Sequence, residues 1–231
     1  MHGLGRIPSP PDGNDWQLKR FLSAPEVTER FWDIGPILDQ GSTPHCVGFS
    51  SAGWGNCLPV DDDWQDKDGH AIYRECKVLD GELDGENGSY VRTAAKVLQN
   101  RERIDNYAFG SVSDAHRFLL TQGPVVFGID WYSGMGDPDE NGVIRPTGYV
   151  AGGHAILAYG ADENYCHLQN SWGKSWGNDG CCKISWADLE TCFGQWGEAM
   201  AAVELPLDAP PQSDSLWARI IRFVKYLWSL L

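Results

Sequence analysis

Cys46 lies where a turn-rich segment meets an apolar stretch, a position suited to nucleophilic chemistry. Gly41, Ser42 and Pro44 precede it and oppose regular structure, whereas apolar residues then continue as far as Pro59 and predict a helix that begins at the cysteine. The positive end of the helix dipole and the unpaired N–H groups of a first turn favour the thiolate, which is the nucleophilic form. A buried structural cysteine fits the same pattern, and this segment alone leaves the two interpretations equal.

Three polar residues could assist such a nucleophile. Gln40 lies shortly upstream of Cys46. Its side-chain amide can donate a hydrogen bond to an oxyanion that forms beside the cysteine. His154 stands at the start of an apolar, strand-like run, and Asn170 follows directly on a second strand-like run. A cysteine, a histidine and an orienting amide are the groups that acyl transfer by a thiol requires.

The order Gln, Cys, His, Asn, with the blocks 170–173 (Asn-Ser-Trp-Gly) and 176–177 (Trp-Gly), resembles the papain-like cysteine peptidases over roughly residues 30–206. The resemblance implies that Cys46 attacks a peptide carbonyl as the thiolate of a thiolate–imidazolium pair. His154 would move the proton and Asn170 would orient the imidazole. Gln40 and the backbone N–H of Cys46 would stabilise the oxyanion.

The resemblance also implies which residues line the substrate cleft. Gly88 and Ser89, in a glycine-rich turn before a helix, correspond to a wall that lends its backbone to the substrate, although an ordinary helix-entry turn is an equal alternative. Gly153 adjoins the predicted histidine, and Trp172 would shield the contact between Asn170 and His154 from water.

The chain departs from the family pattern at three places near the nucleophile. Thr43 stands where the family usually has a half-cystine, Val47 replaces the tryptophan that usually follows the nucleophile, and His45 replaces a serine. We expect a peripheral role for His45, since only His154 has the strand context and the downstream asparagine. With 45 residues before Cys46, we expect a prokaryotic or phage-type member without a long inhibitory propeptide.

The elements that must position these residues follow a simple order along the chain, with helices in its first half and mostly strands in its second half. Apolar periodicity predicts helices over 70–79, 89–100 and 113–122. Strands are predicted at 125–129, around His154, and at 165–169 and 183–185, with a long loop over 131–147. This order predicts an α+β protein. The resemblance implies the papain-like two-lobed fold, with a helical N-terminal lobe, an antiparallel β-sheet C-terminal lobe and the active site in the cleft between them.

Changes in composition divide the chain into four parts. We expect an extended arm over 1–27, the peptidase domain over 28–207, a Pro-rich linker over 208–214 and a basic amphipathic helix over 215–231. The last helix suits a membrane surface. Docking on the acidic body of the protein or on a second subunit fits it equally well.

Charge and cysteine content restrict which partners and which cellular compartment we expect. The net charge of −14 argues against a nucleic-acid partner. We identify no secretory signal, so the seven cysteines are expected to be free thiols in the cytoplasm. Asp61, Asp62 and Asp63 are more typical of a solvated loop than of a metal site, and we expect neither a metal nor a cofactor.

The sequence therefore predicts a cysteine-type peptidase that acts on peptides or proteins through an acyl-enzyme thioester. Two alternatives stay open. One is a non-catalytic peptide-binding module on the same scaffold. The other is a related acyl-transfer enzyme, a transpeptidase or an amidase.

Overall fold

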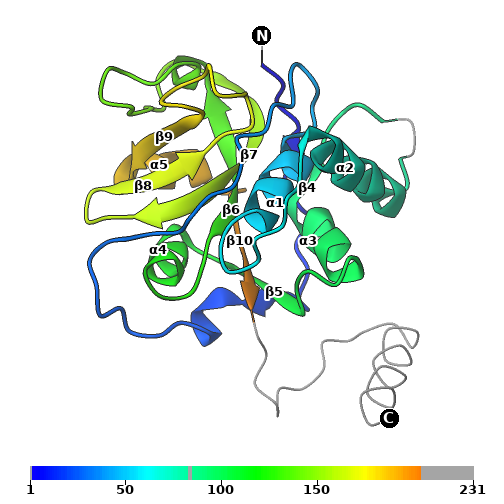
Figure 1. Cartoon of the computed structure of the whole chain (residues 1–231), viewed down its shortest axis with the longest axis horizontal. Coiled ribbons are helices and arrows are strands. Elements are labelled where there is room, and N and C mark those ends of the chain that lie inside the picture. The colour runs from blue at the N-terminus through cyan, green and yellow to red at the C-terminus, as the bar shows by residue number, and fades with distance from the viewer. Residues whose placement is uncertain (1, 83–84, 204–231) are drawn as a thin grey trace.

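The structure is a computed structural model that describes residues 2–82 and 85–203 (Figure 1). The helices are α1 (Cys46–Gly55), α2 (Asp66–Asp80), α3 (Val91–Asn100), α4 (Val112–Thr121), α5 (Trp186–Phe193) and the 3-10 turns η1 (Leu18–Arg20) and η2 (Ser133–Met135). The strands are β1 (Arg6–Ile7), β2 (Trp16–Gln17), β3 (Arg30–Phe31), β4 (Ser89–Tyr90), β5 (Asn106–Gly110), β6 (Val125–Tyr132), β7 (Val150–Ala161), β8 (Tyr165–Gln169), β9 (Cys181–Ser185) and β10 (Glu198–Val203). The predicted linker and amphipathic helix lie outside the described residues and stay predictions.

Helix α1 is the centre of the helical side of the molecule. It begins at Cys46, as predicted, and all of its residues are buried. A helix that is apolar around its whole circumference needs neighbours on every side. Here α2 and α3 cover one part of α1, and the sheet residues Ala155 and Leu157 belong to the same apolar cluster.

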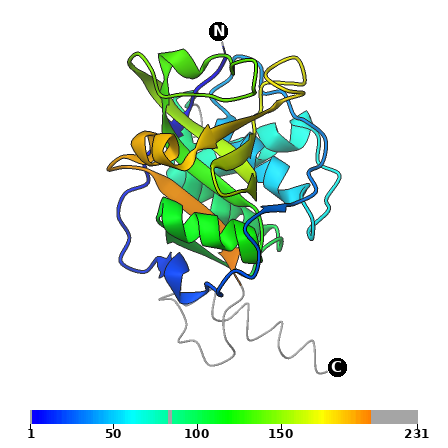
Figure 2. The same ribbon diagram turned by 90° about the vertical axis from the view of Figure 1, so that its left-hand side faces the viewer.

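The main sheet has the strand order β2-β5-β10-β6-β7-β8-β9, with β3 also paired to β7. All of these pairs are antiparallel except the parallel pair of β2 and β5. Side chains on a strand alternate between the two faces. Thus Val125 and Phe127 belong to the apolar cluster with α4 and α5, whereas Val126 belongs to the cluster with α1. Figure 2 shows α4 and α5 in front of the sheet, on the face away from α1.

The α+β class and the arrangement in two lobes, each with its own apolar cluster, are confirmed. Most predicted elements are present with shifted ends. The helix predicted from Ser89 begins only at Val91, because Ser89 and Tyr90 pair with Arg6 and Ile7 as strand β4. The loop predicted from Trp131 is shorter, because β6 continues to Tyr132.

The first residues of the chain are packed against both lobes. Leu18 is fully buried in the core of the sheet lobe, and β2 extends the sheet beside β5. Asp15 forms an ion pair with Arg92 of α3. Figure 1 shows the blue N-terminal segment passing between the helical and the sheet lobes before it reaches these anchors. Among the described residues, no helix is both long and apolar enough to cross a membrane.

Candidate active site

A tight turn positions Gln40 beside the end of strand β8. The backbone N–H of Gly41 donates to Asp39 Oδ1 at 2.8 Å, and the N–H of Gln40 donates to the carbonyl of Ser171 at 2.9 Å. The side chain is held at both ends. Ser171 Oγ contacts Oε1 at 2.5 Å, and Nε2 donates to the carbonyl oxygen of Thr43 at 2.6 Å. Because a carbonyl oxygen only accepts, this contact fixes which end of the amide is the nitrogen.

The thiol of Cys46 lies against strand β7 and is completely buried. Its sulfur accepts from the N–H of Ala155 at 3.4 Å, and the N–H groups of Gly5 and Val47 also face it. Burial nevertheless raises the pKa of the Cys46 thiol to about 11, because the loss of hydration outweighs these donors. Burial in this structure thus favours the neutral thiol over the thiolate.

His154 and Asn170 form a buried pair with a defined tautomer. His154 Nε2 lies 2.8 Å from Asn170 Oδ1, which also accepts from the N–H of Ser171 at 2.8 Å. Since a backbone N–H only donates, the shared atom is the amide oxygen, and the imidazole must carry its proton on Nε2. Nδ1 has no hydrogen-bond partner within the described part of the chain. The neutral ring thus keeps a lone pair on Nδ1 that is available as a base.

Burial also sets the protonation state of His154. It lowers the pKa of this imidazole to about 4, and the hydrogen bond with Asn170 only partly offsets the effect. Burial therefore favours the neutral forms of both Cys46 and His154 in this closed arrangement, and the thiolate–imidazolium pair stays a prediction.

Indole rings enclose the histidine–asparagine pair. The ring of Trp172 lies 4.9 Å from that of His154, and Trp131 contacts His154 edge-on at 4.8 Å. Trp176 packs perpendicular to Trp172 at 5.3 Å and is held by a hydrogen bond from its Nε1 to the carbonyl of Gly136 at 2.6 Å. These rings exclude water from the hydrogen bond that fixes the tautomer.

Residues 2–7, here called the cleft segment, occupy the space in front of Cys46. The N–H of Gly5 donates to the carbonyl of Gly153 at 3.1 Å, and its carbonyl accepts from the N–H of Ser89 at 2.9 Å. Arg6 and Ile7 then pair with β4 in parallel. The cleft segment therefore bridges β7 of the sheet lobe and β4 of the helical lobe, as Figure 1 shows.

All four residues predicted to line the substrate cleft contact this segment. Ser89 and Gly153 hydrogen-bond to Gly5, and a Cβ placed on Gly88 would lie 2.0 Å from the carbonyl oxygen of Gly5. Trp172 stacks on the ring of His2 at 4.6 Å with an interplanar angle of 10°. The side-chain amide of Gln40 donates to the carbonyl of Gly3 at 3.1 Å. The predicted catalytic and substrate-binding residues thus converge on one groove, which the protein's own backbone fills.

Glycines allow this close approach. A Cβ on Gly3 would lie 1.9 Å from the carbonyl oxygen of Thr43, and one on Gly5 would lie 2.0 Å from that of Pro44. No side chain fits at either position without displacing the backbone. In this conformation a substrate cannot reach the sulfur of Cys46.

His45 points into the helical lobe. Its Nδ1 lies 2.7 Å from His70 Nδ1, its Nε2 lies 2.9 Å from Glu86 Oε2, and its ring stacks on Tyr73 at 3.8 Å. Burial lowers the pKa of His45, and Glu86 partly offsets this. These contacts anchor the turn before Cys46 to helix α2.

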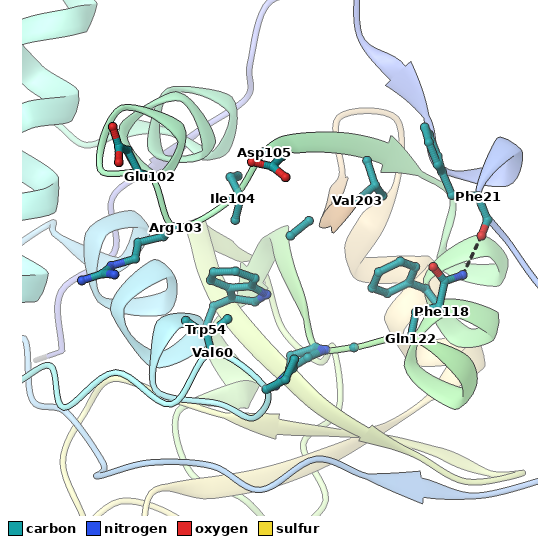
Figure 3. A pocket seen from close by; sticks show the side chains of 14 residues that line it. Phe21, Trp54, Val60, Glu102, Arg103, Ile104, Asp105, Phe118, Gln122 and Val203 are labelled. Carbon is teal, nitrogen blue, oxygen red and sulfur yellow. Dashed lines mark hydrogen bonds between the residues drawn. The ribbon is translucent and has the colours of Figure 1, made fainter. Parts of the chain in front are cut away.

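A separate cavity of about 590 Å³ lies at the other end of α1. Figure 3 shows Trp54, near the C-terminal end of this helix, with Phe118 and Val203 among the lining side chains. Gln122 donates to the carbonyl of Phe21 at 2.6 Å at its rim. None of the predicted site residues lines this cavity, so its volume does not mark the catalytic centre.

Three residues of the groove are given no role by the sequence analysis. They are Ser171, which holds Gln40, and the two members of the ion pair between Arg6 and Glu198. The glycines at positions 3 and 5 are the only local signal, because small residues permit close backbone contact. Glu198 follows a turn and shows no distinctive spacing.

Comparison with known proteins identifies relatives of the chain. The model of the papain family of cysteine proteases matches residues 60–199. Two curated proteins of Giardia intestinalis align over short segments. Cathepsin B-like CP2 is 47% identical over 47 residues, and cathepsin B-like CP3 is 40% identical over 72 residues. These segments span 18% and 29% of this chain but only 16% and 24% of the relatives.

Solved structures show the same fold at low identity. Xylellain, a cysteine protease from Xylella fastidiosa, superposes with a TM-score of 0.68 at 19% identity, covering 88% of this chain and 97% of that one. The digestive procathepsin L2 proteinase from Tenebrio molitor gives a TM-score of 0.54 at 22% identity, over 79% of this chain and 70% of that one.

Proposed function

The chain belongs to the papain family of cysteine proteases, and from this premise we propose that it hydrolyses peptide bonds with Cys46 as nucleophile and His154 as general base. Asn170 orients the imidazole, and Gln40 together with the backbone N–H of Cys46 stabilises the oxyanion. The N–H of Cys46 suits this role because it lies in the first turn of α1, where N–H groups lack intrahelical acceptors.

The observation that carries the proposal is the contact between the groove and the cleft segment. The cleft segment, a stretch of ordinary polypeptide, lies across Cys46 and forms backbone hydrogen bonds on both sides. One of its carbonyl groups, that of Gly3, accepts a hydrogen bond from Gln40 Nε2. A groove that binds backbone in this way suits a peptide substrate, whose main chain offers the same groups.

The first chemical step forms an acyl-enzyme. Once the groove is open, water enters and the burial that keeps both groups neutral is relieved, which favours proton transfer from the thiol to His154 Nδ1. The thiolate attacks the carbonyl carbon, and the oxyanion receives hydrogen bonds from Gln40 and the N–H of Cys46. The imidazolium then protonates the leaving amine, and a thioester to Cys46 remains.

The second step releases the acyl group. His154, neutral again, removes a proton from a water molecule that attacks the thioester carbonyl. The tetrahedral intermediate collapses, the thiol leaves with a proton, and the product is a carboxylic acid. Asn170 holds the ring in the same orientation through both steps.

Product analysis on the full chain tests this proposal. We expect fluorogenic peptides to be cut to free carboxylates, and an epoxysuccinyl reagent to attach to Cys46 of the parent. Cys46→Ala and His154→Ala should abolish turnover. A new amide, formed when an amine acceptor is added, would instead identify a transferase. Binding of peptides without turnover, together with no adduct on Cys46, would indicate a binding module.

We further propose that the protein works in a reducing compartment such as the cytoplasm. All seven cysteines are free in the structure, which supports this placement. Mass analysis of the native protein under non-reducing conditions should find seven alkylatable thiols after unfolding. A stable disulfide among them would contradict the proposal.

A further inference from the structure

The helical side of the groove is formed by a short stretch, residues 85–89, here called the groove wall. The N–H of its last residue, Ser89, donates to the carbonyl of Gly5 in the cleft segment at 2.9 Å. Gly88 lies so close that a Cβ there would be 2.0 Å from the same oxygen. The position of the groove wall therefore decides whether the N–H of Ser89 reaches a backbone acceptor in the groove.

Two side chains of α2 bind both backbone groups of Gly88 from behind. The N–H of Gly88 donates to the hydroxyl oxygen of Tyr73 at 3.1 Å, and its carbonyl accepts from Lys77 Nζ at 3.0 Å. Tyr73 and Lys77 are four residues apart and so share one face of the helix. They are only 1% and 3% exposed. Buried groups thus hold this residue at both of its polar atoms.

Lys77 acts on the same peptide group that faces the groove. The carbonyl of Gly88 and the N–H of Ser89 belong to one planar trans peptide, so they point in opposite directions. Lys77 bonds the carbonyl and Gly5 bonds the N–H. Holding the carbonyl from behind directs the N–H into the groove, and a cation at the carbonyl also polarises the group and makes the N–H a better donor.

The burial of a lysine at this place has a cost that packing alone does not require. Besides the Gly88 carbonyl, Nζ donates to Glu82 Oε2 at 2.6 Å and to Asn87 Oδ1 at 2.8 Å. The three protons of the ammonium therefore have three acceptors. An apolar side chain of similar volume would avoid the loss of hydration. The peptide of the groove wall supplies a reason for the charge.

Tyr73 fixes the other end of the groove wall. Its hydroxyl accepts from Gly88 and donates to the carbonyl of Gly85 at 3.2 Å. Burial raises the pKa of Tyr73 to about 12, so the hydroxyl keeps the proton that it donates. His45 also reaches the wall, at Glu86, but that carboxylate is 70% exposed and such pairs contribute little. Tyr73 and Lys77 are therefore the main anchors.

We propose that Lys77 and Tyr73 are positioning residues for substrate binding, which act by fixing the backbone of Gly88 so that the N–H of Ser89 faces the groove. Neither side chain touches the substrate. The inference rests on the proposed peptidase function and adds to it the side chains that hold the binding wall in place. In the closed structure the same two residues hold the cleft segment through Gly5.

Alkylation of Cys46 by iodoacetamide in the full chain tests the inference without any catalysis. Lys77→Met removes the three donors and keeps an unbranched side chain, and Tyr73→Phe removes only a hydroxyl. A buried polar group that loses its partner shifts an equilibrium by roughly 5- to 150-fold. We expect each variant to weaken the hold on the cleft segment and to accelerate labelling about 5-fold or more, as followed by peptide mass mapping.

Two control variants separate this role from a general loss of stability. Lys67→Met makes the same charge change at an exposed position of α2 and should label like the parent. Leu119→Ala weakens the fully buried core around α4, away from the groove wall. Labelling in Tyr73→Phe and Lys77→Met that is no faster than in either control would overturn the inference. If Lys77→Met does not fold, Tyr73→Phe decides alone.

Steady-state kinetics then measure the effect on a peptide substrate. They are recorded in full chains that also carry Gly5→Ala, because in the parent a weaker hold on the cleft segment would offset a weaker hold on the substrate. Active sites are titrated with an epoxysuccinyl reagent. We expect Lys77→Met and Tyr73→Phe to raise KM about 5-fold or more and to change kcat per active site less than twofold.

The two readouts distinguish failure of the inference from failure of the proposed function. A lower number of titrated sites with unchanged KM would assign Lys77 and Tyr73 a structural role and overturn the inference. If no variant and no parent hydrolyses peptides, the peptidase function fails, and the labelling rates of Cys46 still decide whether Lys77 and Tyr73 position the groove wall.

Discussion

The carbonyl oxygen of Gly3 lies 3.1 Å from Gln40 Nε2, the side-chain amide that we propose as an oxyanion donor. The protein's own backbone therefore uses the hydrogen bond that the reaction would require. Gln40 is at the same time held by Thr43 and Ser171, so its amide is directed into the groove before any substrate arrives. Preorganised donors of this kind need no rearrangement in the transition state.

Gly5→Ala should release the cleft segment. The new Cβ would lie 2.0 Å from the carbonyl oxygen of Pro44, and overpacking of this type costs roughly 1–3 kcal/mol. The population with an open groove should rise roughly 5- to 150-fold. The measurement is the rate at which iodoacetamide alkylates Cys46, followed by peptide mass mapping.

Gly13→Ala provides the control for this substitution. It lies in the same N-terminal region, and a Cβ there would meet no atom within 4 Å. Alkylation of Cys46 should match that of the parent. If Gly5→Ala and Gly13→Ala labelled Cys46 equally slowly, the cleft segment would not control access to the thiol.

His2→Ala should weaken the closure to a smaller extent. His2 stacks on Trp172, and an aromatic pair contributes about 0.5–1.5 kcal/mol beyond its buried area. Labelling of Cys46 should accelerate roughly 2- to 10-fold, whereas His2→Phe, which keeps a ring over Trp172, should stay close to the parent. Identical rates for the alanine and phenylalanine variants would show that the stacking does not hold the segment.

Gln40→Ala should lower kcat without a comparable change in KM. Loss of one oxyanion donor typically costs about 10²–10³ in kcat. Ser171→Ala removes the contact to Gln40 Oε1 and acts through the position of that amide, so a smaller loss is expected. Steady-state kinetics on a saturating peptide measure both. A Gln40→Ala enzyme with unchanged kcat would remove Gln40 from the mechanism.

Acid should destabilise the closed structure through His154. Its pKa is about 4 when folded, against an ordinary value of 6.5, so between these values the unfolded chain binds more protons. Stability therefore falls as the pH is lowered from 6.5, by about 3 kcal/mol once the pH is below 4. Thermal unfolding of Cys46→Ala, which cannot digest itself, between pH 7.5 and 4 measures this slope.

The variant that also carries His154→Asn should show a flatter profile. Some acid sensitivity will remain, because burial also lowers the pKa of His45 and of His116. Parallel profiles for the two proteins would mean that His154 is already hydrated in the folded state.

The sequence predicts the helices of both lobes well because their signals are local. The amphipathic pattern of α2 and the stop signal Gly123-Pro124 after α4 need no knowledge of the rest of the chain. It predicts the strand that carries His154 for the same reason. By contrast, β10 begins with Glu198 directly after a turn, and its pairing with β5 and β6 depends on residues about 70 to 95 positions earlier.

The closure of the groove is not predictable from local pattern. It depends on contacts of the cleft segment with Gln40, Ser89 and Gly153, which are far apart in sequence. The same holds for the ion pair of Arg6 and Glu198, whose members are 192 positions apart. Only the fold brings such groups together, whereas Cys46, His154 and Asn170 are recognisable because each has a characteristic local setting.

Because the cleft segment and the groove belong to one chain, the segment would compete in cis with the peptide substrates that we propose. The local concentration of a tethered ligand is typically of millimolar order and does not change when the protein is diluted. A single cut in the connection between Ile7 and the anchor at Asp15 would turn this unimolecular contact into a bimolecular one. Dilution would then favour dissociation of the released peptide from the groove. One cleavage would thus act as an irreversible switch.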